Sequence, residues 1–460
     1  MKRFRSIHRV TRLAATSKIV AGRKRRFPLC TSACVAIGLA VVFATTSTAV
    51  GAATVLIPRT RGVASAVTTW RRGVEIRLPM NAKPANQSAG LYSVACPRAG
   101  DCVAGGAYES TQGGDAMVVT ESSGRWRQAT EVTLPSNAQS QPYAEVNGVA
   151  CAAVGSCVAV GYYSYEFPDV DNAFLVTETH GTWGSATDVQ LPANSASVVQ
   201  AGLQWVACAR PGFCVATGGY LDQSGNFQAM VVTEAKGKWG RATELQLPAN
   251  AGAAPDTYMS YVTCTGARSC VAVGEYQDRS IHSQGMVAVE SKGRWQRAVE
   301  VRLPSNAAAD PDAGAYSVSC WKVGGCLVLG SYTDKSHVDE AMALIGSGGR
   351  WARATEVRFR PPHAAANSAD DVGGLWCAPS ASCVAVGDYK DTAGHLQDMA
   401  ATWSEGKWSH VTEIPQPRNE NSAPDSYLYA VACARAGSCN AVGYYKDNSG
   451  IFQAMAATTG

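Results

Sequence analysis

The chain has 460 residues, with 40 Lys and Arg against 36 Asp and Glu, 16 Cys and 45 Gly. A hydrophobic content of 46% is that of globular proteins and excludes wholesale disorder. Residues 1–74 carry 14 basic and no acidic side chains, which leaves 26 basic and 36 acidic ones in residues 75–460. So acidic a body excludes general binding to nucleic-acid phosphates.

The first 58 residues have the features of an export segment. A basic segment ends in the run at 23–26, and an apolar stretch over 30–57 follows it. This order is typical of a signal peptide, and small residues at 47–53 offer cleavage sites. The apolar stretch is also long enough for an uncleaved membrane anchor, a single transmembrane helix. Both alternatives place residues 59–460 outside the cytoplasm, either secreted or anchored to the cell membrane.

Seven copies of one unit fill the rest of the chain. The motif Gly-x-Trp recurs at intervals of 56 or 57 residues, and each unit contains four short apolar segments separated by turn residues. Examples are 91–96, 157–163, 229–234 and 131–135. Short, evenly spaced strands indicate an all-β fold. Four strands repeated seven times predict a seven-bladed β-propeller of four-stranded blades.

The two ends of this array complement each other. The last unit ends at Gly460 after its third strand, without Gly-x-Trp and without a fourth strand. The missing piece stands at the start of the array, at 74–79. We therefore expect the N-terminal strand 74–79 to complete the last blade, because an open array would leave exposed sheet edges.

Fourteen cysteines form seven pairs whose members are six positions apart. Such cysteines can face each other across a tight hairpin, whereas zinc binding would require regular histidine partners that the sequence lacks. We therefore predict one disulfide per blade, which also indicates an oxidising compartment. The predicted bonds are Cys96–Cys102, Cys151–Cys157, Cys208–Cys214, Cys264–Cys270, Cys320–Cys326, Cys377–Cys383 and Cys433–Cys439.

Two further rows of residues recur with the repeat. A tyrosine follows each second cysteine by six positions and is interpreted as packing between blades, with a ring of ligand-stacking groups as the alternative. These residues are Tyr108, Tyr163, Tyr220, Tyr276, Tyr332, Tyr389 and Tyr445. An aspartate two positions later is interpreted as a turn cap, with calcium ligation as the alternative. These residues are Asp222, Asp278, Asp334, Asp391 and Asp447.

The order of strand, tight turn, Val-Ala-Val-Gly strand and Thr-Glu-x-x-Gly-x-Trp resembles the Asp-box (BNR) propellers. That group includes sialidase-superfamily and photosystem-assembly-factor-like repeats, and the resemblance covers residues 70–460. It implies a propeller fold and, for sialidase relatives, carbohydrate chemistry. Glutamate or another residue stands where the motif has aspartate, as at Glu121, Glu178, Glu234 and Glu290. The chain is also similar to poorly characterised secreted proteins of high-GC Gram-positive bacteria.

Candidate functional residues are those that break the repeat on the loops of one face. The second unit has an enlarged loop with Glu166, Asp169 and Asp171, and the connection into the sixth unit contains Asp370 and Asp371. Paired carboxylates can perform glycosidic acid/base catalysis or bind calcium, while solvated loop acids are the alternative. No cofactor is expected, and no metal, because the histidines show no metal-binding spacing.

These observations predict an extracytoplasmic, non-catalytic binding or scaffold propeller, with an unidentified protein or glycan of the cell envelope as its partner. We expect a monomer, with anchoring through residues 30–57 as one form of attachment. The alternative is a glycoside hydrolase or lyase that uses the irregular acidic loops. A purely structural envelope protein is a third class. The ligand itself is left open.

Overall fold

The computed structural model describes residues 69–84, 87–138, 143–165, 170–359, 361, 363–365 and 371–460. The described residues all lie within the unit Val67–Gly460. The predicted signal peptide or anchor at 1–58 therefore lies outside them. In the described part of the chain, no helix is long and apolar enough to cross a membrane.

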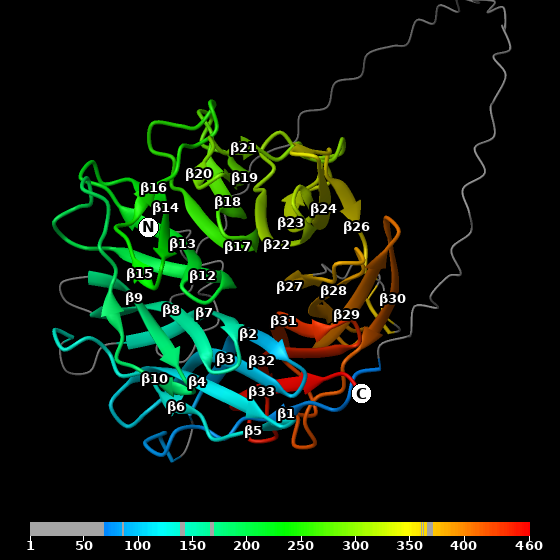
Figure 1. The fold of residues 1–460 in the computed structure, drawn as a ribbon. Helices are drawn as coiled ribbons and strands as arrows, with labels where there is room; N and C mark the ends of the chain where they lie inside the picture. The colour runs from blue at the N-terminus through cyan, green and yellow to red at the C-terminus, as the bar shows by residue number, and fades with distance from the viewer. Residues whose placement is uncertain are drawn as a thin grey trace, which may run out of the picture. The chain divides into compact units, whose positions relative to one another are not determined.

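The described residues form seven antiparallel sheets, each of which is one blade of a propeller (Figure 1). The first strand of each blade contacts the first strands of both neighbouring blades, so these strands surround a common axis. The first strands are β2 (Ala89–Arg98), β7 (Tyr143–Ala153), β12 (Ala201–Arg210), β17 (Tyr258–Gly266), β22 (Gly314–Lys322), β27 (Asp371–Cys377) and β31 (Ser426–Arg435).

The second and third strands follow in order away from the axis. The second strands are β3 (Asp101–Glu109), β8 (Ser156–Tyr165), β13 (Phe213–Leu221), β18 (Ser269–Gln277), β23 (Gly325–Thr333), β28 (Cys383–Lys390) and β32 (Ser438–Lys446). The third strands are β4 (Gly114–Ser122), β9 (Val170–Thr179), β14 (Phe227–Ala235), β19 (Ser283–Ser291), β24 (Asp339–Ser347), β29 (Leu396–Ser404) and β33 (Phe452–Thr458).

The fourth strand is broken in the first five blades. Two short pieces both pair with the third strand, one with the Gly-x-Trp tryptophan and one with the Thr-Glu segment or its equivalent. The pieces are β5 (Arg125–Trp126) and β6 (Thr130–Glu131), β10 (Thr182–Trp183) and β11 (Thr187–Asp188), β15 (Lys238–Trp239) and β16 (Thr243–Glu244), β20 (Arg294–Trp295) and β21 (Val299–Glu300), β25 (Arg350–Trp351) and β26 (Thr355–Val357). The sixth blade has one continuous strand, β30 (Lys407–Glu413).

The seventh blade receives its fourth strand from the other end of the chain. Strand β1 (Val74–Glu75) pairs antiparallel with β33, with Val74 opposite Ala456. Trp70 bridges Thr459, and the Ile76 N–H donates to the Ala454 carbonyl at 2.9 Å. The segment at 74–79 contributes a strand of only two residues, yet the described ends of the propeller are joined within one sheet.

A disulfide joins the first and second strands of every blade, and all seven predicted bonds are present. The paired Cα atoms lie 3.9–4.1 Å apart. Each hairpin requires one residue with positive φ. Glycine fills this position in five blades, whereas Arg268 (φ 71°) and Ala381 (φ 60°) adopt the same left-handed conformation in the other two. A side chain there costs about 1 kcal/mol relative to glycine.

Every first strand contains a β-bulge at the same place, which shows as a register shift such as that between Leu203 and Trp205. The bulge explains an invariant glycine on the second strand. A Cβ on Gly218 would lie 1.9 Å from the carbonyl oxygen of Gly202, and the other six blades repeat this close approach at 1.8–2.1 Å. No side chain fits there, so the glycine allows the bulged strand to approach.

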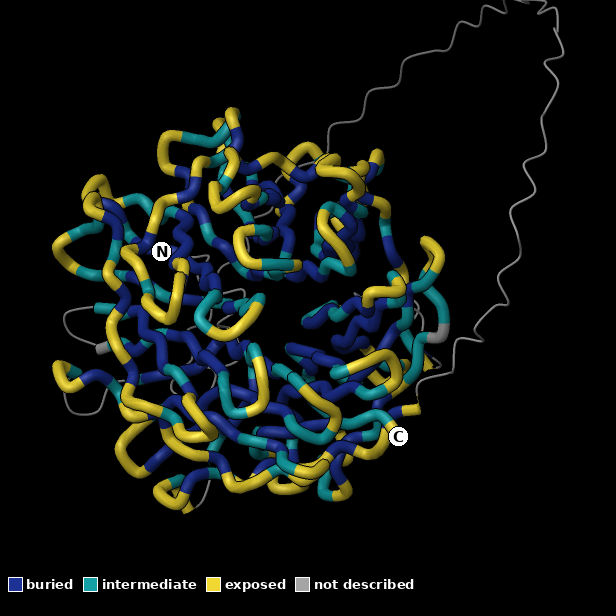
Figure 2. The backbone as a smooth tube through the Cα atoms, in the orientation of Figure 1, coloured by how far each residue is buried: buried dark blue, intermediate teal, exposed yellow. Residues whose placement is uncertain are grey.

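The strands of the blades are largely buried (Figure 2), and the hydrophobic core lies between the blades. Seven clusters of buried residues each draw on the facing sides of two neighbouring blades. The recurring methionines of the third strands belong to these clusters, as Met230 does between the second and third blades. Packing between blades therefore accounts for most of the apolar repeat pattern.

Candidate functional site

The seven recurring tyrosines are buried and join neighbouring blades. The Tyr220 hydroxyl donates to Glu244 Oε2 at 2.7 Å, and Asn194, from the preceding blade, donates to the same oxygen at 2.8 Å. The sets are Asn81–Tyr108–Glu131, Asn137–Tyr163–Asp188, Asn194–Tyr220–Glu244, Asn250–Tyr276–Glu300, Asn306–Tyr332–Glu356, Tyr389–Glu413 and Asn419–Tyr445–Glu75. These tyrosines pack between blades, so the structural interpretation is confirmed.

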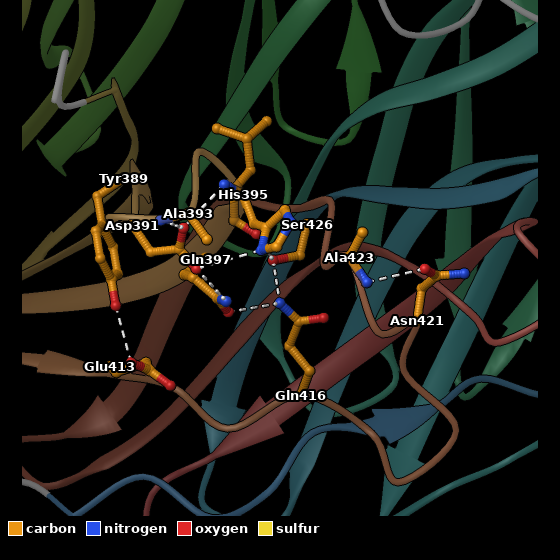
Figure 3. A network of polar contacts seen from close by, with 11 residues as sticks. Tyr389, Asp391, Ala393, His395, Gln397, Glu413, Gln416, Asn421, Ala423 and Ser426 are labelled. Carbon is orange, nitrogen blue, oxygen red and sulfur yellow. Dashed lines mark hydrogen bonds and ion pairs between the residues drawn. The ribbon is translucent and has the colours of Figure 1, made fainter. Parts of the chain in front are cut away.

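The recurring aspartates cap turns. The N–H groups of Ala393 and His395 both donate to Asp391 Oδ1 at 2.9 Å, and Gln397 donates to Oδ2 at 3.2 Å (Figure 3). Burial raises the pKa of Asp391, but these hydrogen bonds outweigh it and leave the pKa below its ordinary value. Among the described residues, no three His, Cys, Asp or Glu side chains are spaced to hold a metal ion.

Four glutamates at the Asp-box position are buried at the end of the third strand, beside the Gly-x-Trp tryptophan. Glu234, for example, is the register partner of Trp239. Burial raises the pKa of each of them; they are Glu121, Glu178, Glu234 and Glu290. They lie toward the end of the blades that contains the disulfides, as the bond from Asn440 to both Glu121 and Cys102 shows.

The blades differ from one another in one layer of residues near the opposite end, where the first strands begin. The layer consists of one pair of cross-strand partners in each blade. The partner on the second strand directly precedes the recurring tyrosine, and the partner on the first strand lies opposite it. The pairs are Gly90/Ala107, Glu145/Tyr162, Gly202/Gly219, Tyr258/Glu275, Gly314/Ser331, Asp371/Asp388 and Tyr427/Tyr444. Small residues occupy the first, third and fifth blades, and tyrosines or carboxylates occupy the others. We call this set the variable layer.

The bulge residues form a second varied row, next to the variable layer. They are Tyr92, Asn147, Gln204, Ser260, Tyr316, Gly373 and Tyr429. In the first and fifth blades, a large bulge residue lies over a glycine of the variable layer. A Cβ on Gly314 would meet the ring of Tyr316, and one on Gly90 would lie 3.1 Å from Cε1 of Tyr92. The two rows are therefore matched in size in these two blades.

Tyrosines and carboxylates of several blades gather at this end of the axis. Tyr143 opens β7, and Asp171 lies near the start of β9. We define the axial mouth as Tyr92, Tyr143, Glu145, Tyr162, Asp171, Tyr258, Glu275, Tyr316, Asp371, Asp388, Tyr427, Tyr429 and Tyr444. Most of these side chains are half-buried, so they retain accessible surface.

One large side chain crosses the axis beneath the axial mouth. Trp205, one position after the bulge on β12, stacks on Tyr261 of β17 with ring centroids 3.8 Å apart. The indole of Trp205 packs against the core cluster between the seventh and first blades. It also packs against the clusters between the third and fourth blades and between the fourth and fifth blades. It therefore reaches across the axis and gives the axial mouth a floor.

Electrostatic effects connect the groups of the axial mouth across the axis. Burial raises the pKa of Tyr429, and Glu145 of the second blade and Asp371 of the sixth raise it further. Burial also raises the pKa of Tyr258, followed by Glu145 and Glu275. The hydroxyls therefore stay protonated at neutral pH and can donate hydrogen bonds, as Tyr143 does to Glu145 Oε2 at 2.9 Å.

The rings of the axial mouth contact one another. Tyr429 lies 4.5 Å from Tyr427, 5.9 Å from Tyr444 and 5.3 Å from Tyr92, measured between ring centroids. The Tyr92 contact is edge-to-face at 85°. Aromatic pairs favour such offset and edge-to-face geometries at these separations. The seventh and first blades thus present a continuous aromatic surface to the axial mouth.

A row of three aspartates crosses the sixth blade. Asp371 lies opposite Asp388, which lies opposite Asp398 on β29, so all three side chains share one face of the sheet. Asp371 is exposed, Asp388 is 5% exposed and Asp398 is fully buried. Burial raises the pKa of Asp398 well above its ordinary value, against a smaller opposing effect of the Ser426 hydroxyl. Burial therefore favours the protonated form of Asp398.

The surroundings of Asp398 are polar but leave its carboxyl unsatisfied. Neither of its oxygens has a hydrogen-bond partner. The Ser426 hydroxyl accepts from Gln416 and lies 3.4 Å from the Leu396 carbonyl oxygen. Figure 3 shows Gln416 directed toward both Ser426 and Gln397. Gln416 Oε1 shares the condition of the two Asp398 oxygens, since it too has no hydrogen-bond partner.

The structure places two of the candidate acids at the axial mouth, because Asp171 raises the pKa of Tyr162 and Asp371 that of Tyr427. Protein surrounding Asp371 raises its pKa although the side chain is exposed. Glu166, Asp169 and Asp370 lie outside the described residues. Sequence reasoning missed the other mouth residues; they are Tyr92, Tyr143, Glu145, Tyr162, Tyr258, Glu275, Tyr316, Asp388, Tyr427, Tyr429 and Tyr444.

One signal in the aligned repeats marks several of the missed residues. The position directly before the recurring tyrosine is Ala or Gly in the first and third blades, but Glu275, Asp388 and Tyr444 in later ones. A position that varies between repeats, directly before a tyrosine that is present in all seven, identifies the second-strand residues of the variable layer from the sequence alone.

No family model matches the chain, and no curated protein does. Solved structures with similar folds include the Hadza microbial sialidase Hz136, at 11% identity and a TM-score of 0.45 over 78% of this chain and 73% of that one. A protein of unknown function from Dyadobacter fermentans has 10% identity and a TM-score of 0.45 over 86% and 99% of the two chains. The α-L-arabinanase of Penicillium chrysogenum has 10% identity and a TM-score of 0.40 over 84% and 98%.

Proposed function

We propose that the chain is an extracytoplasmic binding protein that holds its ligand at the axial mouth. The variable layer carries this proposal, because a single ligand on the axis needs a surface that is not sevenfold symmetric. Tyrosines and carboxylates of four blades alternate there with small residues of three. Half-buried aromatic rings, a few polar groups and a closed floor are the usual components of a ligand site.

The compartment follows from the cysteines. Seven disulfides indicate an oxidising environment outside the cytoplasm, because such bonds are reduced in the cytosol. Export through residues 1–58, with cleavage or anchoring by 30–57, is part of the proposal. The expected partner is a glycan or protein of the cell envelope, bound by a monomer.

A glycoside hydrolase is the second candidate, and the aspartate row favours it. Directly opposed residues in a sheet have Cβ atoms about 4.5–5.5 Å apart. Retaining glycosidases have carboxyl groups about 5–5.5 Å apart. Asp371 is exposed and has a raised pKa, as a general acid requires, and Asp388 is its cross-strand partner in the position of a nucleophile. The resemblance to the Asp-box propellers, which include sialidases, also supports carbohydrate chemistry.

Glycan arrays and pull-downs from cell-envelope extracts test the proposal. The full chain should retain a specific set of ligands that Tyr429→Ala loses. Phe213→Ala provides the control, because Phe213 stacks with Arg210 at the end that contains the disulfides. Equal retention by wild type and Tyr429→Ala would contradict binding at the axial mouth. Release of new reducing ends from a retained glycan, abolished by Asp371→Asn, would instead establish the hydrolase.

A further inference from the structure

One polar side chain interrupts the apolar packing around the disulfides. The residue directly after each second cysteine shares a core cluster with the second cysteine of the next blade, as Val103 does with Cys157. This residue is apolar in six blades, where it is Val103, Val158, Val215, Val271, Leu327 or Val384. The seventh blade has Asn440 instead. An amide therefore lies at the interface of the seventh and first blades, where the other interfaces have a hydrocarbon side chain.

Asn440 is 6% exposed and directs its amide nitrogen at the disulfide of the first blade. Nδ2 donates to Sγ of Cys102 at 3.1 Å and to Oε2 of Glu121 at 3.2 Å, and Sγ of Cys96 lies 3.6 Å from the same nitrogen. Oδ1 of Asn440 is buried without a hydrogen-bond partner among the described residues. A buried amide that is only half satisfied costs stability, so its placement against the sulfurs calls for an explanation in chemistry.

That chemistry follows from what sulfur accepts. A sulfur atom without charge is a weak hydrogen-bond acceptor, whereas hydrogen bonds to an ionised acceptor are about twice as strong as neutral ones. The amide of Asn440 therefore stabilises Cys102 more as a thiolate than as half of a disulfide. A stabilised thiolate has a lower pKa, and a thiol of lower pKa is the faster leaving group in thiol–disulfide exchange.

The two sulfurs of this disulfide differ in accessibility. Cys96 is half-buried, whereas Cys102 is 1% exposed. An attacking thiolate reaches the accessible sulfur and displaces the other one. In the first blade the displaced sulfur is that of Cys102, which is the one closer to Asn440.

The backbone beside Cys96 is also less tied to its neighbour than in the other blades. The two cysteines are register partners in the six other blades. In the first blade the ladder is interrupted between Ala95 and Arg98, so that Cys96 and Cys102 are not paired. Pro97 lies within this gap and has no N–H to donate to the ladder. The hairpin around the first disulfide is therefore easier to distort.

We propose that the disulfide Cys96–Cys102 undergoes exchange with a small external thiol, with Cys96 as the attacked sulfur and Asn440 as the donor to the departing one. The external thiolate forms a bond to Sγ of Cys96, and the bond between the two cysteines breaks. Its electron pair leaves with Cys102, which takes up the proton that the attacking thiol released. A second thiol then displaces Cys96, so two thiols become one external disulfide and the cysteine pair gains two electrons and two protons.

This site is separate from the axial mouth, because the disulfides lie at the opposite end of the blades. Its test starts from the oxidised full chain under native conditions at about pH 8, where reduced glutathione is partly thiolate. Samples are alkylated with iodoacetamide at intervals, and peptide mass spectrometry then assigns each label to its cysteine.

The disulfide of the third blade is the matched control. Cys208 is half-buried and Cys214 is buried, as in the first blade, but Val158 shares the core cluster of Cys214 in place of an amide. We expect Cys96 and Cys102 to be labelled about tenfold faster than this control pair. Before the second thiol acts, glutathione should be attached to Cys96 and not to Cys102.

Two variants connect the rate to its proposed causes. Asn440→Val installs the residue type of the other blades and should slow reduction of Cys96–Cys102 about fivefold, without changing the rate at Cys208. Pro97→Ala returns an N–H to the strand and should also slow the first-blade reaction. The denaturation midpoint of each variant shows that it is folded, which separates an effect on exchange from general loosening.

Three results would overturn the inference. The first is equal labelling of the first-blade and third-blade pairs, and the second is glutathione attached to Cys102. The third is an unchanged rate in Asn440→Val or, if that variant does not fold, in Pro97→Ala. None of these results bears on the axial mouth, whose function is decided by the array ligands of Tyr429→Ala.

Discussion

The triad formed by Glu75, Asn419 and Tyr445 holds the two described ends of the propeller together. The Tyr445 hydroxyl lies 2.7 Å from Glu75 Oε2 and 2.9 Å from Asn419 Oδ1, and Asn419 Nδ2 donates to Glu75 at 2.9 Å. Tyr445→Phe keeps the buried ring and removes only the hydroxyl. A hydrogen bond to a charged group contributes about 1.5–3 kcal/mol, so we expect the attachment of β1 to weaken by about 2 kcal/mol.

Native-state hydrogen exchange measures this attachment directly. The Ile76 N–H is bonded to Ala454 and the Arg71 N–H to Thr458, so both amides exchange when the N-terminal segment detaches. A loss of about 2 kcal/mol should speed their exchange about 30-fold in Tyr445→Phe. The matched control is Tyr276→Phe, which breaks an equivalent triad within one continuous part of the chain.

The control separates ring closure from general loosening. Tyr276→Phe should leave exchange at Ile76 and Arg71 within threefold of wild type. If Tyr445→Phe also changes these amides less than threefold, or if both variants speed them equally, the triad does not hold the ends together and the reasoning from its hydrogen bonds is refuted.

Three further predictions concern stability. Replacing Cys208 and Cys214 by Ser removes a bridge across a six-residue separation and should cost about 2 kcal/mol in denaturant unfolding. Burial raises the pKa of Glu178, so the folded state loses stability as pH rises through that raised value. Glutamine cannot ionise, so Glu178→Gln should raise the denaturation midpoint at about pH 7.5. It should leave the midpoint unchanged at about pH 4, where Glu178 is itself protonated. Ala381→Gly should stabilise by about 1 kcal/mol in the same assay, because Ala381 has a φ of 60°; an unchanged midpoint would contradict this.

The fold was predictable because its determinants repeat. Cysteines six apart fix the hairpin between first and second strands, and the spacing of Gly-x-Trp fixes the blade length. The short fourth strand at Val74–Glu75 was visible because the last unit lacks one. The cysteine pair occurs seven times and Gly-x-Trp six times at nearly constant intervals, and the closing strand is identified by the one unit that lacks its own.

The axial mouth was predictable only in part, because it depends on register. Asp171 and Asp371 adjoin irregular loops and were noticed for that reason. The opposition of Asp388 and Asp398 follows from the pairing of β28 with β29, which a residue pattern alone does not give. The bulge in the first strands adds one residue without altering the interval between repeats, so the row that contains Tyr316 was hidden.

Size matching between blades distinguishes a built site from a set of solvated loop acids. Independent surface acids need no compensation from their neighbours, whereas here a Cβ on Gly114 would lie 2.5 Å from the Tyr143 ring and one on Gly219 would lie 3.1 Å from that of Tyr258. Those glycines belong to other blades than the rings they admit. The rings are thus held in place by residues of several blades, and they lower the solvent exposure of the carboxylates beside them. A charge held in such surroundings interacts more strongly with a ligand than one on a free loop, which is why the departures from sevenfold repetition have their chemical effect at the axial mouth.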